Sequence, residues 1–253
     1  KYVQELGYYL MLYSAKDTDK IFQMVMGWDV DGVIAISFSK SNCEKIYQLI
    51  NKPIVSIDAY GELDAGQENH VLNIGLDDES GGYLMTKYLL ECGYEHIQVC
   101  AGRDNGVDHF RYMGAQRAAK EFAGKKQKVQ FTALGMNYAK RKESYAWLIQ
   151  RKKPKTALFF LSDLYALEAI SFFSSRGVKI PEEIGIAGYD NISYAEFSVP
   201  RLTTISQNVE QKASLAVEIL MERINGVEKE RENEIELPVT LIPRKSVQPQ
   251  DEN

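Results

Sequence analysis

The sequence predicts an α/β protein made of two doubly wound parallel-sheet lobes with a cleft between them. Short apolar runs alternate with segments whose apolar residues recur at helical spacing, and this alternation is typical of strand–helix units in parallel sheets. The alternation breaks over residues 101–108, which contain two glycines and two aspartates, and then starts again. We therefore expect an N-terminal lobe of residues 1–102 plus 207–228 and a C-terminal lobe of residues 103–206 plus 234–246. Residues 247–253 form a polar tail that we expect to be disordered.

In the first lobe, strands are predicted where apolar residues run together, and helices where apolar residues share one face. The clearest helix covers residues 81–92, in which Leu84, Met85, Tyr88 and Leu89 share one face, and Gly93 ends it. The expected order is a helix end at 1–6, a strand at 8–14, a helix at 18–26, a strand at 32–36, a helix at 42–50, strands at 54–57 and 71–74, the helix at 81–92 and a strand at 96–100.

The rest of the chain repeats this order of strands and helices. Asp163 and Asn208 are predicted N-caps, and Gly177 and Gly226 are predicted helix ends. Residues 188–200 are expected to form a loop. The expected helices are 110–122, 138–150, 164–176 and 209–225, and the expected strands are 129–132, 157–161, 185–187, 203–206 and an extended run at 235–243.

Composition limits the classes of function. The 253 residues are 45% hydrophobic and carry a formal net charge of −5, so the chain can bury a full core and is a poor non-specific binder of nucleic acid. The odd number of cysteines, three, favours a reducing compartment, and we expect a cytoplasmic protein. No apolar run approaches membrane-spanning length, so no membrane partner is expected.

The motifs of catalysis and cofactor binding are missing. The sequence contains no G-x-G-x-x-G after a strand, no phosphate loop with its Lys and Ser or Thr, and no G-x-S-x-G. His70, His96 and His109 lack metal-ligand spacing. We therefore expect no cofactor and no metal. An enzyme acting on sugars with Asp190 as base is disfavoured, because no nucleophile accompanies it.

Polar residues at predicted strand ends are the candidate site. Asp190 follows the strand at 185–187, where ligands bind in open α/β sheets, although an acid in Tyr-Asp-Asn is also ordinary turn chemistry. Ser162 follows the strand at 157–161, and Arg111 begins a helix after the lobe boundary. Carboxylates accept hydrogen bonds from hydroxyls and arginine donates through a rigid fork, which suits a polyhydroxylated ligand. The acids at 77–79 are interpreted as helix-capping residues that favour the helix dipole, with ligand binding as the alternative.

A set of short segments, in order along nearly the whole chain, resembles the effector-binding part of LacI/GalR-family transcriptional regulators. Each segment is a weak signal, but the ordered set is specific. The family patterns that they resemble are D-G-(I/V)-I at 31–34, P-V-V-x-I-D at 53–58, D-N-x-x-G-(G/A) at 77–82 with H-L-I-x-x-G-H at 88–94, R-x-x-G at 111–114, (N/S)-D-x-x-A at 162–166, G-(F/Y)-D-(D/N) at 188–191, P-x-L-T-T-(I/V)-x-Q at 200–207 and L-P-x-x-L-x-x-R-x-S at 237–246.

The resemblance implies a periplasmic-binding-protein-like domain of type I that closes on a small effector, most often a sugar or sugar derivative. By matching position, Arg111, Asp190 and Ser162 are expected to contact the effector, and Ser80 is expected to reach it from the first lobe. The helix at 209–225 should return to the first lobe. The implied protein is a homodimeric repressor that binds operator DNA through an N-terminal helix-turn-helix absent from this chain.

Two departures from the family pattern are present. Tyr94 stands where the family usually has histidine, which we expect to alter packing. The chain also begins after the positions of the family's DNA-reading region, hinge helix and first strand, and our hypothesis is that it is a fragment of a longer protein. The alternative function is a solute-binding protein of a sugar transporter. Self-association distinguishes the two, because such regulators dimerise whereas transport binding proteins are usually monomers.

Overall fold

The chain folds into two compact α/β units, each with a four-stranded parallel sheet. The computed structural model describes residues 2–14, 17–104, 106–122, 127–227 and 229–248. Unit 1 comprises Lys1–Leu76 and Asn208–Leu237, and unit 2 comprises Asp77–Gln207 and Pro238–Asn253. The predicted α/β class with parallel sheets is therefore confirmed.

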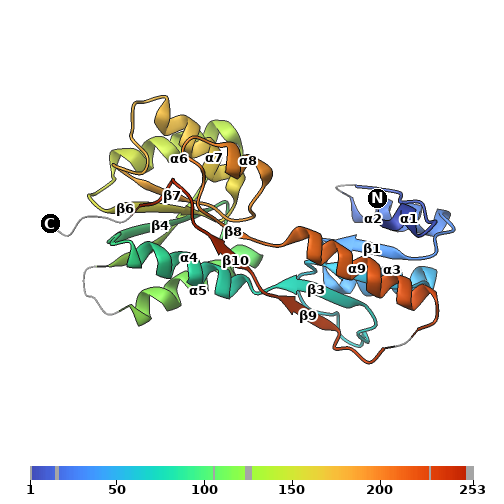
Figure 1. Cartoon of the computed structure of the whole chain (residues 1–253). Coiled ribbons are helices and arrows are strands. Elements are labelled where there is room, and N and C mark those ends of the chain that lie inside the picture. The colour runs from blue at the N-terminus through green and yellow to red at the C-terminus, as the bar shows by residue number, and fades with distance from the viewer. Residues whose placement is uncertain (1, 15–16, 105, 123–126, 228, 249–253) are drawn as a thin grey trace. The chain divides into compact units, whose positions relative to one another are not determined.

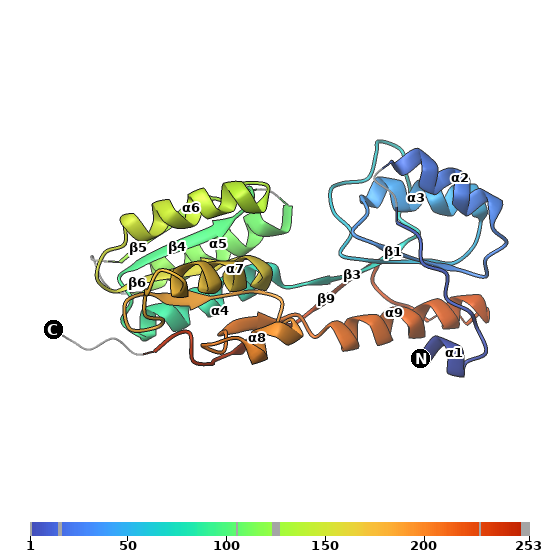
Figure 2. The ribbon, with the colours of Figure 1, turned by 90° about the horizontal axis from the view of Figure 1, so that it is seen from above.

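Unit 1 is a parallel sheet covered by helices on both faces. Helices α2 and α3 lie on one face and α9 lies on the other, against β1 and β2 (Figure 2). All four residues of β2 are buried, as expected for a strand covered on both faces. The last long helix, α9, lies in unit 1, the unit that contains the first predicted strands. The elements are α1 (Tyr2–Glu5), α2 (Thr18–Gly27), β1 (Val33–Ile36), α3 (Lys40–Ile50), β2 (Ile54–Ile57), β3 (Leu72–Leu76), α9 (Val209–Ile224) and β9 (Glu234–Leu237), and the sheet order is β1-β2-β3-β9.

The predicted strand at residues 8–14 is wrong. This segment is not part of any strand, and its apolar side chains are exposed, Tyr9 to 95% and Leu12 to 87%. The apolar run alone predicted a strand, but a strand also needs a neighbour for its backbone groups. Among the described residues, β1 pairs only with β2, and no strand pairs with residues 8–14.

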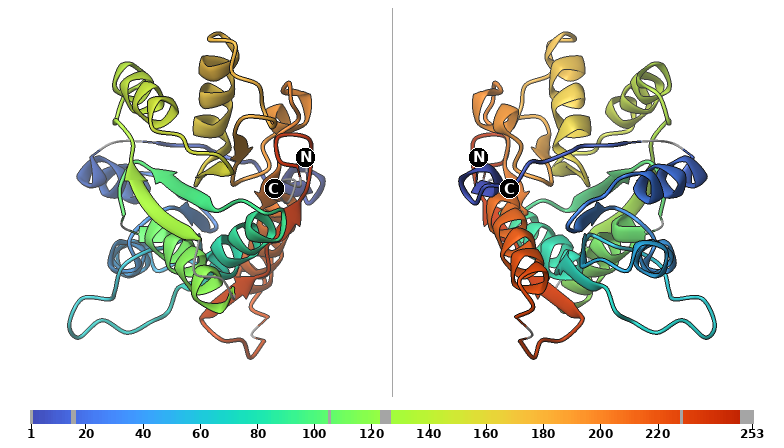
Figure 3. Two further views of the ribbon diagram at one scale, coloured as in Figure 1. Left: turned by 90° about the vertical axis from the view of Figure 1, so that its left-hand side faces the viewer. Right: turned by 90° about the vertical axis from the view of Figure 1, so that its right-hand side faces the viewer.

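Unit 2 is a second parallel sheet between two helix layers. Helices α6 and α7 cover one face, and α4 and α5 cover the other, as Figure 1 and the end-on views of Figure 3 show. Tyr145, Phe160 and Phe173 are fully buried between the sheet and the α6–α7 layer. The elements are α4 (Asp78–Glu91), β4 (His96–Ala101), α5 (Gly106–Glu121), β5 (Lys128–Ala133), α6 (Tyr138–Gln150), β6 (Thr156–Phe160), α7 (Asp163–Ser174), β7 (Gly185–Ala187), α8 (Ser193–Phe197), β8 (Thr204–Ser206) and β10 (Thr240–Ile242). The sheet order is β5-β4-β6-β7, and β8 pairs with β10 in an antiparallel ribbon.

The boundary between the units differs from the one predicted after residue 102. The structure places it between Leu76 and Asp77, because α4 packs tightly on α5. A Cβ atom at Gly82 would lie 1.8 Å from the Arg111 carbonyl oxygen, and one at Gly114 would lie 1.8 Å from the Glu79 carbonyl oxygen. These glycines let the two helix backbones touch, so α4 belongs to the same unit as α5.

Four smaller predictions also differ from the structure. Asp163 is the first residue of α7 and not its N-cap; Ser162 occupies that position without a side-chain cap bond. The predicted loop at 188–200 contains α8, and β9 lies in unit 1 and not in the C-terminal lobe. In the predicted disordered tail, Val247 is buried, and residues 249–253 lie outside the described residues.

None of the described helices is long and apolar enough to cross a membrane.

Candidate functional site

Three of the four predicted site residues meet at the carboxyl end of the unit 2 sheet. Ser162 follows β6, Asp190 follows β7 after two residues, and Arg111 lies on α5 with a bond to the carbonyl group of Leu161. Polar side chains at this edge face the region where open α/β sheets bind their ligands. The sheet thus brings together residues that are up to 79 positions apart in the sequence, from Arg111 to Asp190.

The guanidinium group of Arg111 is buried and held on three sides. Its Nε atom donates to Asp78 Oδ1 at 2.7 Å, and its Nη1 atom donates to the Leu161 carbonyl oxygen at 2.9 Å. Its plane lies over the Tyr189 ring, with 3.7 Å between the guanidinium carbon and the ring centre. Among the described residues, the structure shows no partner for Nη2. Arg111 therefore has a fixed orientation and a donor that remains for a ligand.

Arg111 is the cation of this cluster, and carboxyl groups lie around it. Burial lowers the pKa of Arg111, but the charge of Asp78 and its bond outweigh burial, so the pKa is raised and the side chain stays cationic. Burial raises the pKa of Asp108 to about 6, partly offset by Arg111, whose Nη1 atom lies 3.7 Å from Asp108 Oδ1. The site therefore contains one cationic side chain and several partly buried acidic side chains.

Asp190 is half-buried and accepts bonds at both oxygens. Ser162 Oγ donates to Oδ2 at 3.0 Å, and Gln207 Nε2 donates to Oδ1 at 2.5 Å. Burial raises the pKa of Asp190, and the charge of Arg111 and these donors offset part of that rise. A carboxylate has about four lone-pair positions, so Asp190 can accept further bonds from a ligand hydroxyl.

Ser80 lies in unit 2 with the other three residues, and not in the first lobe as predicted. It occupies the first turn of α4, where its backbone N–H donates to Asp77 Oδ1 at 2.8 Å. Among the described residues, no hydrogen bond joins its side chain to Arg111, Ser162 or Asp190. Ser80 is therefore the predicted site residue that the structure connects least to the others.

The sequence interpretation did not single out Asp78, Tyr189 or Gln207. Of the acids interpreted as helix-capping residues, only Asp77 caps α4, whereas Asp78 bonds to both Arg111 and Tyr189. Tyr189 and Gln207 stood inside the quoted motifs, next to Asp190 and at the end of the following segment. Their positions inside those motifs were the feature of the sequence that could have identified them as neighbours of Asp190.

The strand-end acid of unit 1, Asp58, has a different environment. Lys212 on α9 is buried and bonds to both Asp58 oxygens, at 2.7 and 2.9 Å. This ion pair ties the first turn of α9 to the end of β2. Asp58 therefore joins elements within unit 1.

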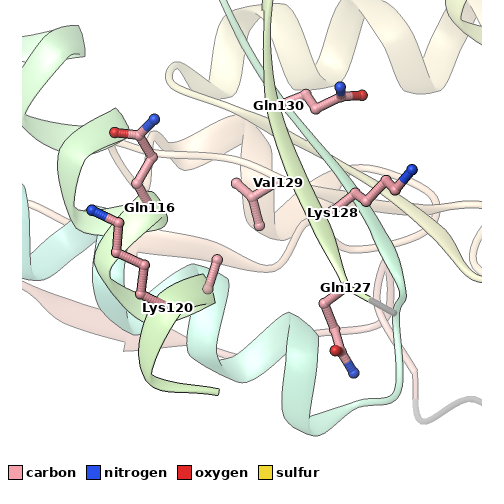
Figure 4. Close-up of a pocket in the computed structure, with 7 residues that line it drawn as sticks. Gln116, Lys120, Gln127, Lys128, Val129 and Gln130 are labelled. Carbon is pink, nitrogen blue, oxygen red and sulfur yellow. The ribbon is translucent and has the colours of Figure 1, made fainter. Parts of the chain in front are cut away.

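A shallow, open depression of about 350 Å³ lies between α5 and β5 (Figure 4). Polar and charged side chains form most of it, and it contains none of the four predicted site residues. Its lining residues are Gln116, Ala119, Lys120, Gln127, Lys128, Val129 and Gln130. The candidate site therefore lies at the strand ends, and this depression is a separate feature of the surface.

Two parallel-sheet α/β units with polar residues at a strand-end edge define a periplasmic-binding-protein-like domain. A family described as "Periplasmic binding protein-like domain" matches residues 86–247, which is more than half of the chain. The chain is also 32% identical over 253 residues to the HTH-type transcriptional repressor PurR of Pasteurella multocida, covering 95% of this chain and 72% of that protein. The chain belongs to the LacI family of transcriptional regulators and contains the effector-binding domain of that family.

Solved structures show the same fold. A LacI-family transcriptional regulator from Enterococcus faecalis with bound ribose superposes with a TM-score of 0.82 at 26% identity, covering 98% of this chain and 91% of that chain. A periplasmic binding protein/LacI transcriptional regulator from Alkaliphilus metalliredigens complexed with D-xylulofuranose gives a TM-score of 0.80 at 26% identity, covering 97% and 90%. These similarities place the chain among regulators and not among enzymes.

Proposed function

We propose that this chain is the ligand-sensing and dimerising domain of a transcriptional repressor, and that its effector is a sugar or sugar derivative. The effector would bind at the carboxyl end of the unit 2 sheet through Arg111, Ser162 and Asp190, with Ser80 as a further contact. The observation that carries this proposal is the convergence of one fixed cation, one hydroxyl and one carboxylate at this edge.

The chemistry of these side chains fits a polyhydroxylated molecule. Each sugar hydroxyl both donates and accepts, and it needs one acceptor and one donor when it leaves water. Asp190 and the hydroxyl oxygen of Ser162 supply acceptors, and Arg111 supplies the Nη2 donor. The solved relatives with ribose and with D-xylulofuranose support a sugar as the effector.

The regulatory role is supported by the family, and it requires that effector binding be coupled to the conformational state of the repressor. The effector acts as a switch only if it binds one state of the repressor more tightly than another. We propose a cytoplasmic homodimer that reaches operator DNA through a helix-turn-helix outside these 253 residues. The net charge of −5 supports a domain that does not itself hold DNA.

Thermal unfolding with D-ribose, D-xylulose, sugar phosphates and nucleobases tests the ligand. At about a hundredfold excess over its Kd, an effector should stabilise the domain by about 2.7 kcal/mol. Asp190→Asn and Arg111→Lys should each remove that stabilisation, because Asn has one acceptor oxygen and Lys lacks the fork. Lys120→Ala, in the depression of Figure 4, is the control and should keep it. A full response from both site variants would refute the site.

Sedimentation equilibrium tests the regulator against the transport alternative. A regulator should be a dimer at micromolar concentration, with or without sugar. A monomer that binds sugar tightly would instead support a solute-binding protein.

A further inference from the structure

The backbone of the Asp190 loop is strained. Asp190 has φ of +119° and Asn191 has φ of +56°, so two consecutive residues with side chains occupy a region that L-residues rarely adopt. Such a conformation persists only where the surrounding structure fixes it, and it is found most often at functional sites. The residues that fix this loop therefore also control where the Asp190 carboxylate lies.

Asp163 holds this loop on both sides of the strained pair. Its backbone N–H donates to the carbonyl oxygen of Tyr189 at 2.7 Å, immediately before Asp190. Its Oδ2 atom accepts from the backbone N–H of Ile192 at 2.9 Å, immediately after Asn191. One residue thus anchors the backbone at both ends of the strained segment.

The rest of the Asp163 carboxylate is fixed by neighbouring elements. Its Oδ1 atom accepts from Thr204 Oγ1 on β8 at 2.6 Å, and both residues are fully buried. A Cβ atom at Gly188 would lie 2.1 Å from that Oδ1 atom. Glycine at 188 therefore leaves the space that the carboxylate occupies, and a side chain at that position would displace it.

We propose that Asp163 is a positioning residue that fixes residues 189–192 so that Asp190 presents its carboxylate beside Ser162. Ser162 precedes Asp163 in the chain, and its hydroxyl donates to Asp190 Oδ2 at 3.0 Å. Ser162 and Asp163 therefore act as one unit, the first on the Asp190 side chain and the second on its backbone. The functional part of this inference rests on the proposed role of Asp190 as an effector contact.

Two variants release the loop by different routes. Asp163→Ala removes the acceptor, and Gly188→Ala displaces it while keeping its charge. In both, the Ile192 amide should exchange its hydrogen about tenfold faster than in the wild type, because it loses its hydrogen-bond acceptor. The carboxyl carbon of Asp190, followed by ¹³C NMR, should titrate at a changed pKa, because release of the loop alters both the burial that raises this pKa and the Ser162 and Gln207 bonds that lower it. The same shift in Gly188→Ala excludes simple removal of the Asp163 charge as its cause.

Glu44→Ala is the matched control for loss of a buried carboxylate. Glu44 is fully buried in unit 1 and accepts from the backbone N–H groups of His70 and Val71, each at 2.7 Å. Its loss should lower the melting temperature without changing either Asp190 or Ile192. Thr204→Val removes only the hydroxyl that bonds to Asp163, and it replaces either loop variant that fails to fold. It should change the Ile192 exchange rate and the Asp190 pKa in the same directions as the loop variants, but by smaller amounts.

Unchanged exchange at Ile192 and an unchanged Asp190 titration in the folded variants would overturn the proposal. Both measurements use the protein without ligand, so they do not depend on which effector binds. If the wild type binds no sugar and yet the loop signals move as expected, the positioning role stands and the proposed effector class fails. If sugar binds and the loop signals stay fixed, the positioning role fails alone.

Discussion

The guanidinium carbon of Arg111 lies 3.7 Å from the centre of the Tyr189 ring, and the two side chains donate to the same oxygen of Asp78. Stacking on an aromatic face holds the plane of the cation while leaving the N–H groups at its edge available. Asp78 fixes that plane from one edge, and the Leu161 carbonyl oxygen accepts from a second atom. The orientation of Arg111 therefore depends on Asp78.

Asp78→Ala should lower the free energy of unfolding by about 3 kcal/mol. Both side chains of the pair are largely buried, at 8% exposure for Arg111 and 12% for Asp78, so the variant leaves a cation in the interior without its carboxylate. Urea denaturation measures the change. A loss of less than about 1 kcal/mol would show that the pair is effectively solvated.

Glu79→Ala is the control on the same turn of α4. Glu79 pairs with Arg117 at 2.6 Å, but their side chains are 37% and 44% exposed. Water screens such a pair, so its loss should change the free energy of unfolding by less than about 1 kcal/mol. The difference between the two variants then measures the effect of burial on otherwise similar acid–arginine pairs.

Gly114→Ala should destabilise unit 2 by about 1–3 kcal/mol. The added methyl group would lie 1.8 Å from the Glu79 carbonyl oxygen, so α4 and α5 must move apart, and the better helix propensity of alanine offsets only about 1 kcal/mol of that cost. Gly102→Ala is the control, since the nearest atom would be 3.9 Å away. Equal stability of the two variants would mean that the helices separate freely.

Much of the fold was predictable because the apolar spacing of each segment is local information. The helix at 138–150 and the strand at 185–187 have the predicted limits. The unit boundary was not predictable from the break at 101–108, because it depends on contact between α4 and α5. Gly82 and Gly114 permit that contact, and their sequence positions do not reveal which backbone they face.

The candidate site was predictable in part for the same reason. Asp190 and Ser162 could be placed at strand ends, and the structure joins them by a hydrogen bond. Asp78 could not be assigned, because an acid at the start of a helix has an ordinary capping role. Its bond to Arg111 connects α4 with α5 across 33 residues, and a single sequence does not show such a contact.

Glu168→Ala should lower the free energy of unfolding by about 3 kcal/mol. Glu168 accepts hydrogen bonds from Nε and Nη2 of the Arg141 guanidinium, each at 2.7 Å, and from the Tyr145 hydroxyl at 2.9 Å. Its removal leaves a largely buried arginine without its carboxylate, and leaves the Tyr145 hydroxyl with only the Tyr165 carbonyl oxygen as acceptor. Thermal or urea unfolding gives the magnitude.

Glu143→Ala, on the same helix as Arg141, is the comparison for that variant. Its ion pair with Lys140 is 64% and 68% exposed, so its loss should change the free energy of unfolding by no more than about 0.5 kcal/mol. A similar loss in both variants would contradict the view that burial makes the Glu168 network important.

Asp163 should make stability fall as pH rises through neutrality. Burial raises its pKa from 3.8 to about 7, although the Thr204 hydroxyl and the Ile192 N–H oppose that rise. The folded state therefore binds a proton that the unfolded state has released. This contribution to stability is fully present below about pH 4 and is lost as pH rises through about 7.

Asp163→Asn isolates that contribution, because asparagine does not titrate. Asp108 and Asp190 also have raised pKa values and act in the same direction, but they remain in both proteins. Between pH 5 and pH 8 the wild type should lose about 2–3 kcal/mol more of its unfolding free energy than the variant, at about 1.4 kcal/mol per pH unit up to the folded pKa. Urea denaturation of both proteins at the two pH values provides the test. Parallel pH dependences would show that Asp163 keeps the same charge in both states, and the donors around it would then outweigh its burial.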